Sequence, residues 1–296
     1  MIMSTMNSTK LASFVNNYTI AKGPPKTIVI HEISKINLAA LQDITVTGTL
    51  LDKQFIRLDP QTNQRHVETP HSGGQYSAEA GDGDLHFCLG DKPIEPHIAC
   101  ELQNAKAWIS TFNKSIGKPI AVSGFFRCMF EHPGFASNDD AHIFEIHPVR
   151  AVSIDGSIHA FNIDTPEQKS IHSWTKPHNL NQQDRQIKVK YDKAKDTLTF
   201  TGMVGKDENY VQVKGNISKV KLNTSGGAPA SFTLDSRDIG HPIQVYCLQG
   251  TTAARQLRQL KNKKKNISMI ALRNIDLGQA LKNRRYVINL LAIYIQ

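Results

Sequence analysis

The order of short apolar segments along the chain limits the possible folds more than any other feature of the sequence. The clearest segment is Ile44–Gly48 (ITVTG), in which apolar residues alternate with threonine, as in a half-buried strand. A near copy follows at Leu198–Gly202 (LTFTG). After each of them come similar strand segments and one helical segment, at 104–116 and at 251–260, in the same order. The sequence therefore predicts two copies of one unit, each with three strands, a helix and two more strands.

The length of the chain agrees with two units of ordinary domain size. The chain has 296 residues, and domains commonly have about 100–200. Its polar beginning ends in Gly23-Pro24-Pro25, and a second polar, proline-broken stretch begins near residue 166. We expect a flexible N-terminal arm at 1–26, a first domain at 27–165, a linker at 166–186 and a second domain at 187–296.

The predicted order of elements resembles that of the OB fold, a five-stranded Greek-key barrel that binds oligonucleotides and oligosaccharides. The resemblance covers roughly residues 27–160 and 187–296, so we predict a mainly β protein with short helices, made of two tandem OB-like five-stranded Greek-key barrels. Segments 82–86 (DGDLH), 98–101 (IACE) and 144–149 (FEIHPV) are also similar to segments of an uncharacterised bacterial OB-like domain. That second resemblance implies a fold but no mechanism.

The excess positive charge of the chain lies at its C-terminal end. The formal net charge is +9, and residues 251–296 hold ten Lys or Arg against a single acid, Asp276. An asymmetry of this kind favours a polyanionic partner. The ten basic residues are Arg255, Arg258, Lys261, Lys263, Lys264, Lys265, Arg273, Lys282, Arg284 and Arg285.

The position of these basic residues in an OB-like barrel favours nucleic acid as the partner. The last of them lie in the loop that joins strands four and five, one of two loops that contact nucleic acid in this fold. Lys and Arg would bind phosphates, and Tyr210, or alternatively Tyr246, Tyr286 or Phe232, would offer a ring on which bases stack. The alternative is a solvated basic surface over aromatic residues that belong to the core.

A set of histidine and glutamate residues in the first unit is a candidate metal site. Side chains alternate along a strand, so three adjacent strands could bring together His86, Glu101, Glu145 and His147. Imidazole and carboxylate ligands of this kind suit Zn, Mn or Fe. The alternatives are polar residues on the solvated side of the barrel and a hydrogen-bonded His and Glu set that fixes strand register. The second unit lacks these residues, so any such site belongs to the first.

The sequence has no established catalytic motif, which favours a non-enzymatic protein. The first hypothesis is a protein that binds single-stranded DNA or RNA through the basic second barrel. One alternative is a metal-dependent hydrolase or nuclease, and another is a protein-interaction module in a larger nucleoprotein assembly. Apart from the candidate divalent metal, no cofactor is expected. Neither a signal peptide nor a membrane span is recognisable, so we expect a cytoplasmic protein with four free, buried cysteines.

Overall fold

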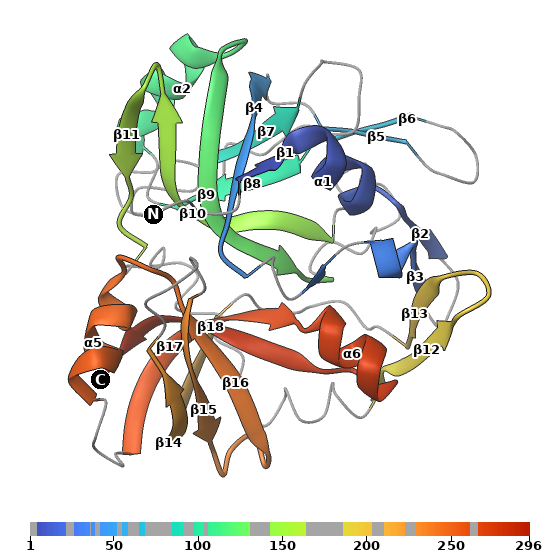
Figure 1. Ribbon diagram of the computed structural model, residues 1–296, viewed down its shortest axis with the longest axis vertical. Coiled ribbons are helices and arrows are strands. Elements are labelled where there is room, and N and C mark those ends of the chain that lie inside the picture. Colours follow the sequence, from blue (N-terminus) through green and yellow to red (C-terminus); the bar gives the residue numbers. More distant parts are fainter. Residues whose placement is uncertain are drawn as a thin grey trace.

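The protein folds into two closed five-stranded barrels (Figure 1), and a computed structural model describes most of the chain. The described residues are 5–21, 27–35, 37–38, 42–51, 55–58, 65–68, 85–90, 98–103, 106–130, 143–163, 186–202, 210–222, 229–260 and 266–296. The strands of the first barrel are β4 (Ile44–Leu51), β7 (Leu85–Gly90), β8 (Ile98–Leu102), β9 (Pro119–Cys128) and β10 (Phe144–Ile154). Those of the second are β14 (Tyr210–Lys221), β15 (Ala230–Asp235), β16 (Pro242–Cys247), β17 (Asn266–Ile275) and β18 (Ile288–Ile295).

Both barrels have the strand order of an OB-like fold. The first closes in the order β4-β7-β8-β10-β9, and the second in the order β14-β15-β16-β18-β17. In each barrel the third and fifth strands pair in parallel, whereas the other pairs are antiparallel. A helix joins the third strand to the fourth in both, namely α2 (Ile109–Ser115), preceded by η3 (Lys106–Trp108), and α5 (Thr252–Leu260). The fold class predicted from the sequence is therefore confirmed.

The opening strand of the second unit is not the one that the sequence comparison suggested. β13 (Thr197–Thr201) contains most of the LTFTG copy, but it lies outside both barrels and pairs with β12 (Lys188–Asp192) and β3 (Thr27–His31). β2 (Tyr18–Ala21) completes this four-stranded accessory sheet. The prediction was wrong because an alternating pattern specifies a half-buried strand without specifying its partners. The later segments of the two units do correspond, from the second strand onward.

The N-terminal segment is folded against the first barrel over the part that is described. β1 (Thr5–Asn7) pairs in parallel with β4, and α1 (Ser8–Val15) buries Leu11 and Phe14 in the core. This differs from the flexible arm expected at 1–26, because the few apolar residues of a polar segment share one helical face. The expected linker at 166–186 lies outside the described residues except for residue 186, so the domain limits stay a prediction.

The remaining described elements are short. β11 (Ser157–Ala160) extends the sheet from β10, and β5 (Phe55–Leu58) forms a hairpin with β6 (Arg65–Glu68). η1 (Ile33–Lys35) follows β3, and α6 (Leu277–Asn283) lies between β17 and β18. In the described part of the chain, no helix combines the length and the apolarity that a membrane-spanning segment requires.

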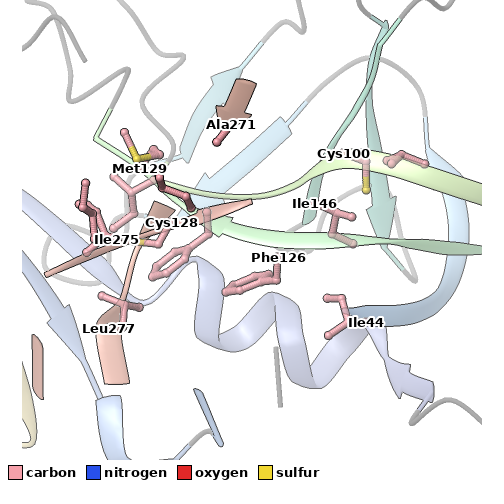
Figure 2. Packing of buried hydrophobic residues seen from close by; sticks show 14 of the residues in the cluster. Ile44, Cys100, Phe126, Cys128, Met129, Ile146, Ala271, Ile275 and Leu277 are labelled. Atoms are coloured by element: carbon pink, nitrogen blue, oxygen red, sulfur yellow. The ribbon is translucent and has the colours of Figure 1, made fainter. Parts of the chain in front are cut away.

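The two barrels and the accessory sheet share a hydrophobic core. Figure 2 shows Cys128 and Met129 of the first barrel in one cluster with Ile275 and Leu277 of the second. A smaller cluster also joins the barrels and contains Phe125, Ile163, Tyr210, Leu248, Leu272, Leu291 and Ile293. The four cysteines are free and buried, as expected. Packing of this extent fixes the position of one barrel against the other.

Candidate functional site

A groove of about 790 Å³ crosses the outer face of the second barrel. Its floor comes from the second and third strands of that barrel, through Thr233 of β15 and Gln244 and Tyr246 of β16. One wall is formed by α6 with the residues on either side of it, including Asp276 before the helix and Arg285 after it. In OB folds the same strands and the loop between strands four and five bind oligonucleotides or oligosaccharides. The groove therefore lies where the topology places a ligand.

A β-bulge brings Lys219 to the edge of the groove. The register of β14 against β15 shifts between Ser218 and Lys221, and Lys219 adopts a left-handed backbone with φ 50°. Such a conformation is unfavourable for a residue with a Cβ atom, and bulges commonly redirect a side chain near a binding site. The bulge thus places an exposed ammonium group beside the floor of the groove.

The opposite wall is also basic. Arg285 lines the groove, and Lys282 and Arg284 are exposed at the end of α6. Arg284 caps the helix in a left-handed conformation, and its backbone N–H donates to the carbonyl of Ala280. Cations near a helix C-terminus are favoured by the helix dipole. Basic side chains therefore lie on both sides of the groove, Lys219 on one and Arg285 on the other.

Tyr246 is the aromatic residue of the groove floor, and it is partly exposed. Burial, and then the charge of Asp276, raise the pKa of Tyr246 to about 12, so its phenol stays neutral and can donate a hydrogen bond. Asp276 itself caps α6, because its Oδ1 accepts from the backbone N–H of Gln279 at 2.9 Å. Tyr246 also packs against the cluster between the barrels, so part of the ring is covered and the rest lines the groove, where a base can contact it.

The structure divides the predicted basic residues into separate groups. Arg255 and Arg258 are exposed on α5, which lies on the other side of the second barrel from α6 (Figure 1). Arg273 is 1% exposed, and its backbone carbonyl accepts from Arg127 of the first barrel. The groove and its rim hold Lys282, Arg284 and Arg285, whereas Lys261 and Lys263, Lys264 and Lys265 lie outside the described residues.

Three of the four aromatic candidates are in the core. Tyr210 is 2% exposed and packs between the barrels, so its ring is closed to a base in this structure. Phe232 and Tyr286 are buried as well, at 0% and 4% exposed. Among these four, Tyr246 is the one that is partly exposed. Strand periodicity could have separated them, since Tyr246 alternates with the buried Val245 and Cys247.

The second candidate site of the sequence is a buried cluster of charges in the first barrel. His147 Nδ1 lies 2.8 Å from Glu101 Oε2 and 3.1 Å from Glu145 Oε1. Arg127 joins them, because its Nη1 donates to Glu145 Oε1 at 2.7 Å and lies 3.4 Å from His147 Nδ1. Ligand atoms of the two glutamates and the histidine lie within 4.8 Å of one another, as a metal site requires. The guanidinium of Arg127, however, already supplies positive charge at this position.

The cluster is charged and closed to solvent. Burial by itself lowers the pKa of His147, but Glu101 and Glu145 outweigh burial and raise the pKa to about 10. His147 is therefore an imidazolium at neutral pH, and two cations balance two carboxylates. An imidazolium also donates at Nε2, and the side-chain amide of Gln103, whose oxygen can accept that hydrogen bond, lies 3.1 Å away. His86, the fourth predicted ligand, pairs with Glu101 across β7 and β8, and the position of its side chain lies outside what is described.

Several residues of the two sites were not predicted from the sequence. Lys219, His241 and Gln244 line the groove, and Arg127 completes the buried cluster. Arg127 did have a signal, because it stands alone in the apolar run Phe125–Phe130 and a buried cation needs a partner. Lys219 had none, since its role depends on a bulge.

Comparisons with known proteins add little to this geometry. No protein-family model and no curated protein sequence matches the chain. Among solved structures, the chain is similar to a small single-stranded DNA-binding protein from Mycoplasma pneumoniae, with 18% identity and a TM-score of 0.23 over 30% of this chain and 91% of the other. It is also similar to the single-stranded DNA-binding protein from Thermus aquaticus, with 13% identity and a TM-score of 0.21 over 86% and 92%. TM-scores this low do not establish a common fold, so the fold assignment depends on the strand pairing.

Proposed function

We propose that the protein binds single-stranded nucleic acid in the groove of the second barrel. The observation that supports this most directly is the position of the groove over β15, β16 and α6, with Lys219 and Arg285 on its two sides. Cationic side chains spaced along a groove neutralise successive phosphates, and an accessible aromatic ring stacks with a base. Duplex DNA offers no unstacked base for such a ring, which favours a single strand.

The groove presents polar side chains that suit the edges of bases. Gln244 and Thr233 lie on its floor, and Gln279 and Asn283 of α6 lie on its wall, where the Asn283 amide donates to Gln279 Oε1 at 3.0 Å. Gln244 Nε2 donates to the carbonyl of Phe232 at 3.1 Å, which fixes the position of its amide. Amides held in this way could contact base edges without adjustment on binding.

Binding is best tested by removing positive charge either from the groove or from the opposite side of the second barrel. Fluorescence anisotropy with labelled oligothymidylate and oligouridylate at low salt would compare the wild type with Lys219→Ala/Arg285→Ala. The matched control is Arg255→Gln/Arg258→Gln, which removes the same charge from α5. We expect the groove pair to lose affinity about tenfold or more, and the slope of log K against log salt to fall by about 1.4, because each phosphate contact on a single strand contributes about 0.7.

Two results would contradict the proposal. One is an absence of binding by the wild type at low salt. The other is an equal loss in both double variants, which would indicate attraction by net charge without a defined site. Lys261 and Lys263, Lys264 and Lys265 follow α5 in sequence, and their participation stays a prediction that the same titration can test with glutamate substitutions.

A metal-dependent reaction in the first barrel is a second candidate, favoured by the convergence of Glu101, Glu145 and His147. These residues would supply two carboxylate oxygens and one imidazole nitrogen. The contact of Arg127 with Glu145 and the burial of the cluster count against it. Elemental analysis of the purified protein, repeated on His147→Ala, would decide: stoichiometric metal that is lost in the variant supports this candidate, and its absence from both rejects it.

A further inference from the structure

The accessory sheet has one apolar face and one polar face. Leu198 and Phe200 of β13 are fully buried, and Phe200 packs against Tyr286 with 6.5 Å between ring centroids. Thr199 and Thr201 alternate with them and therefore lie on the opposite face, where both are partly exposed. Phe200 also packs against Phe130, just after β9 in the first barrel, with 5.2 Å between ring centroids. The accessory sheet is thus attached to both barrels by its apolar face, and its polar face is left for solvent or a ligand.

The polar face is basic along β12. Lys188 pairs with Thr201 and Lys190 with Thr199, and both lysines are exposed. Thr201 in turn accepts from the hydroxyl of Thr27 in β3 at 3.5 Å. Ammonium and hydroxyl groups in adjacent rows are the donors that proteins commonly use to bind phosphate oxygens.

Arg284 joins this basic edge to the groove. Its Nη1 donates to the carbonyl of Tyr191 in β12 at 3.3 Å, and its guanidinium lies 4.8 Å from the centroid of the Tyr191 ring. Arg285, the next residue, lines the groove, and Lys190 precedes Tyr191 in β12. Figure 1 shows the hairpin of β12 and β13 beside α6. Tyr191 pairs with the buried Leu198, so its ring lies on the face opposite to Lys190, and Arg284 contacts β12 at the outer edge of the accessory sheet. A ligand that leaves the groove at Arg284 would therefore cross this edge to reach Lys190 on the polar face.

The acidic residues of the hairpin lie at its turn and are engaged there. Asp192 Oδ1 accepts from the backbone N–H groups of Ala194 and Lys195, and Asp196 accepts from the hydroxyl of Ser34 at 2.7 Å. The strand end with Lys188 and Lys190 has no acid between the two lysines. Positive potential is therefore concentrated on the strand end, away from the turn.

We propose that a single strand bound in the groove continues past Arg284 and along Lys190 and Lys188, so that the accessory sheet is a second phosphate-binding surface. This inference rests on the proposed function, since it extends the path of the same ligand. An OB barrel alone contacts about 4–16 nucleotides. The accessory sheet would lengthen that footprint, and its contribution would appear only with strands long enough to leave the groove.

The test compares a short and a long oligothymidylate, of about 6 and about 20 nucleotides. Lys188→Ala/Lys190→Ala is expected to lower the affinity for the long oligonucleotide about fivefold to tenfold and to lower the slope of log K against log salt for it by about 1.4. The affinity for the short oligonucleotide should not change. The control is Lys193→Ala/Lys195→Ala, which removes two exposed lysines from the turn of the same hairpin. It should change neither affinity by more than about twofold.

The outcomes separate this inference from the proposed function. If the wild type binds neither oligonucleotide, the proposed function is wrong and the inference with it. If it binds both, but the Lys188/Lys190 variant matches the wild type or the control, only the inference is overturned. An equal loss of affinity for the short and the long oligonucleotide also overturns it, because the two lysines would then contribute to binding in the groove and not to a separate surface.

Discussion

At the scale of single residues, the decisive feature is how buried charges are paired. Arg127 and His147 are both 0% exposed, and each contacts Glu145. Leaving any one of these charges without its partner would cost several kcal/mol, about 3–5 for a buried pair. The same burial raises the pKa of Cys100 and Cys128 well above the usual value, so these thiols stay neutral beside the cluster.

The pKa of His147 predicts a loss of stability at high pH. Its folded value is about 10 and its ordinary value is 6.5, so the folded state holds a proton that the unfolded state releases between them. The stabilisation is complete below pH 6.5 and is lost as the pH rises through about 10. Urea unfolding across this range should give a free energy that falls with pH for the wild type and falls less for His147→Gln. Parallel curves for the two proteins would contradict the charge assigned to His147.

At the scale of elements, local irregularities place the groove residues. β14 is a regular strand up to Ser218, where the bulge redirects it, and Lys219 follows with its left-handed backbone. Arg284 ends α6 in a similar conformation. Backbone conformations of this kind cost about 1–2 kcal/mol at a residue other than glycine. Both basic residues that adopt them lie at the groove or its rim.

Lys219→Gly should therefore separate stability from binding. Glycine relieves the left-handed backbone, so the free energy of unfolding is expected to rise by about 0.5–1 kcal/mol, while nucleic-acid affinity falls with the lost charge. Lys214→Gly is the control, because Lys214 lies in a regular part of the same strand and glycine there should lower stability by about 0.5–1 kcal/mol. Chemical denaturation and anisotropy measure the two effects. A loss of stability in both variants would show that the bulge is not strained.

At the scale of the whole molecule, the two barrels are joined by buried polar contacts as well as apolar packing. Cys128 N donates to Asn274 Oδ1 at 2.7 Å, and Arg127 Nε donates to the carbonyl of Arg273 at 3.0 Å. Asn274 also donates to Asn289 within the second barrel at 2.9 Å. Removing a buried partner would leave the N–H of Cys128 unsatisfied, at a cost of about 1–3 kcal/mol.

The barrels are accordingly expected to unfold together. In a Trp174→Phe background, fluorescence reports Trp108 in the first barrel, whereas far-ultraviolet circular dichroism reports strands of both. The two transitions should coincide, and Asn274→Ala should shift both midpoints to a lower denaturant concentration by the same amount. Asn216→Ala, at an exposed position of β14, is the control and should leave them nearly unchanged. Separate transitions for the two probes would mean that the barrels fold independently.

Much of the fold and part of the candidate sites could be predicted from the sequence. The strand periodicity, the helix after the third strand and the loop between the last two strands are local features, and they placed Lys282, Arg284 and Arg285 between the last two strands, where the structure has them. Periodicity also placed Glu101, Glu145 and His147 on adjacent strands, as β8 and β10 are. The opening strand of the second barrel was misassigned, because β13 and β14 both alternate and nothing local distinguishes their partners.

The sequence alone determined the order of the elements, since side-chain period and turn residues act over a few positions. Only the tertiary structure decided which residues face a ligand. Burial depends on what packs against a strand from elsewhere in the chain, so Arg273 and Tyr210 are buried while Tyr246 is partly exposed. The groove itself forms from strands and a helix that are distant in sequence, and its basic edge reaches β12 through the contact of Arg284 with Tyr191.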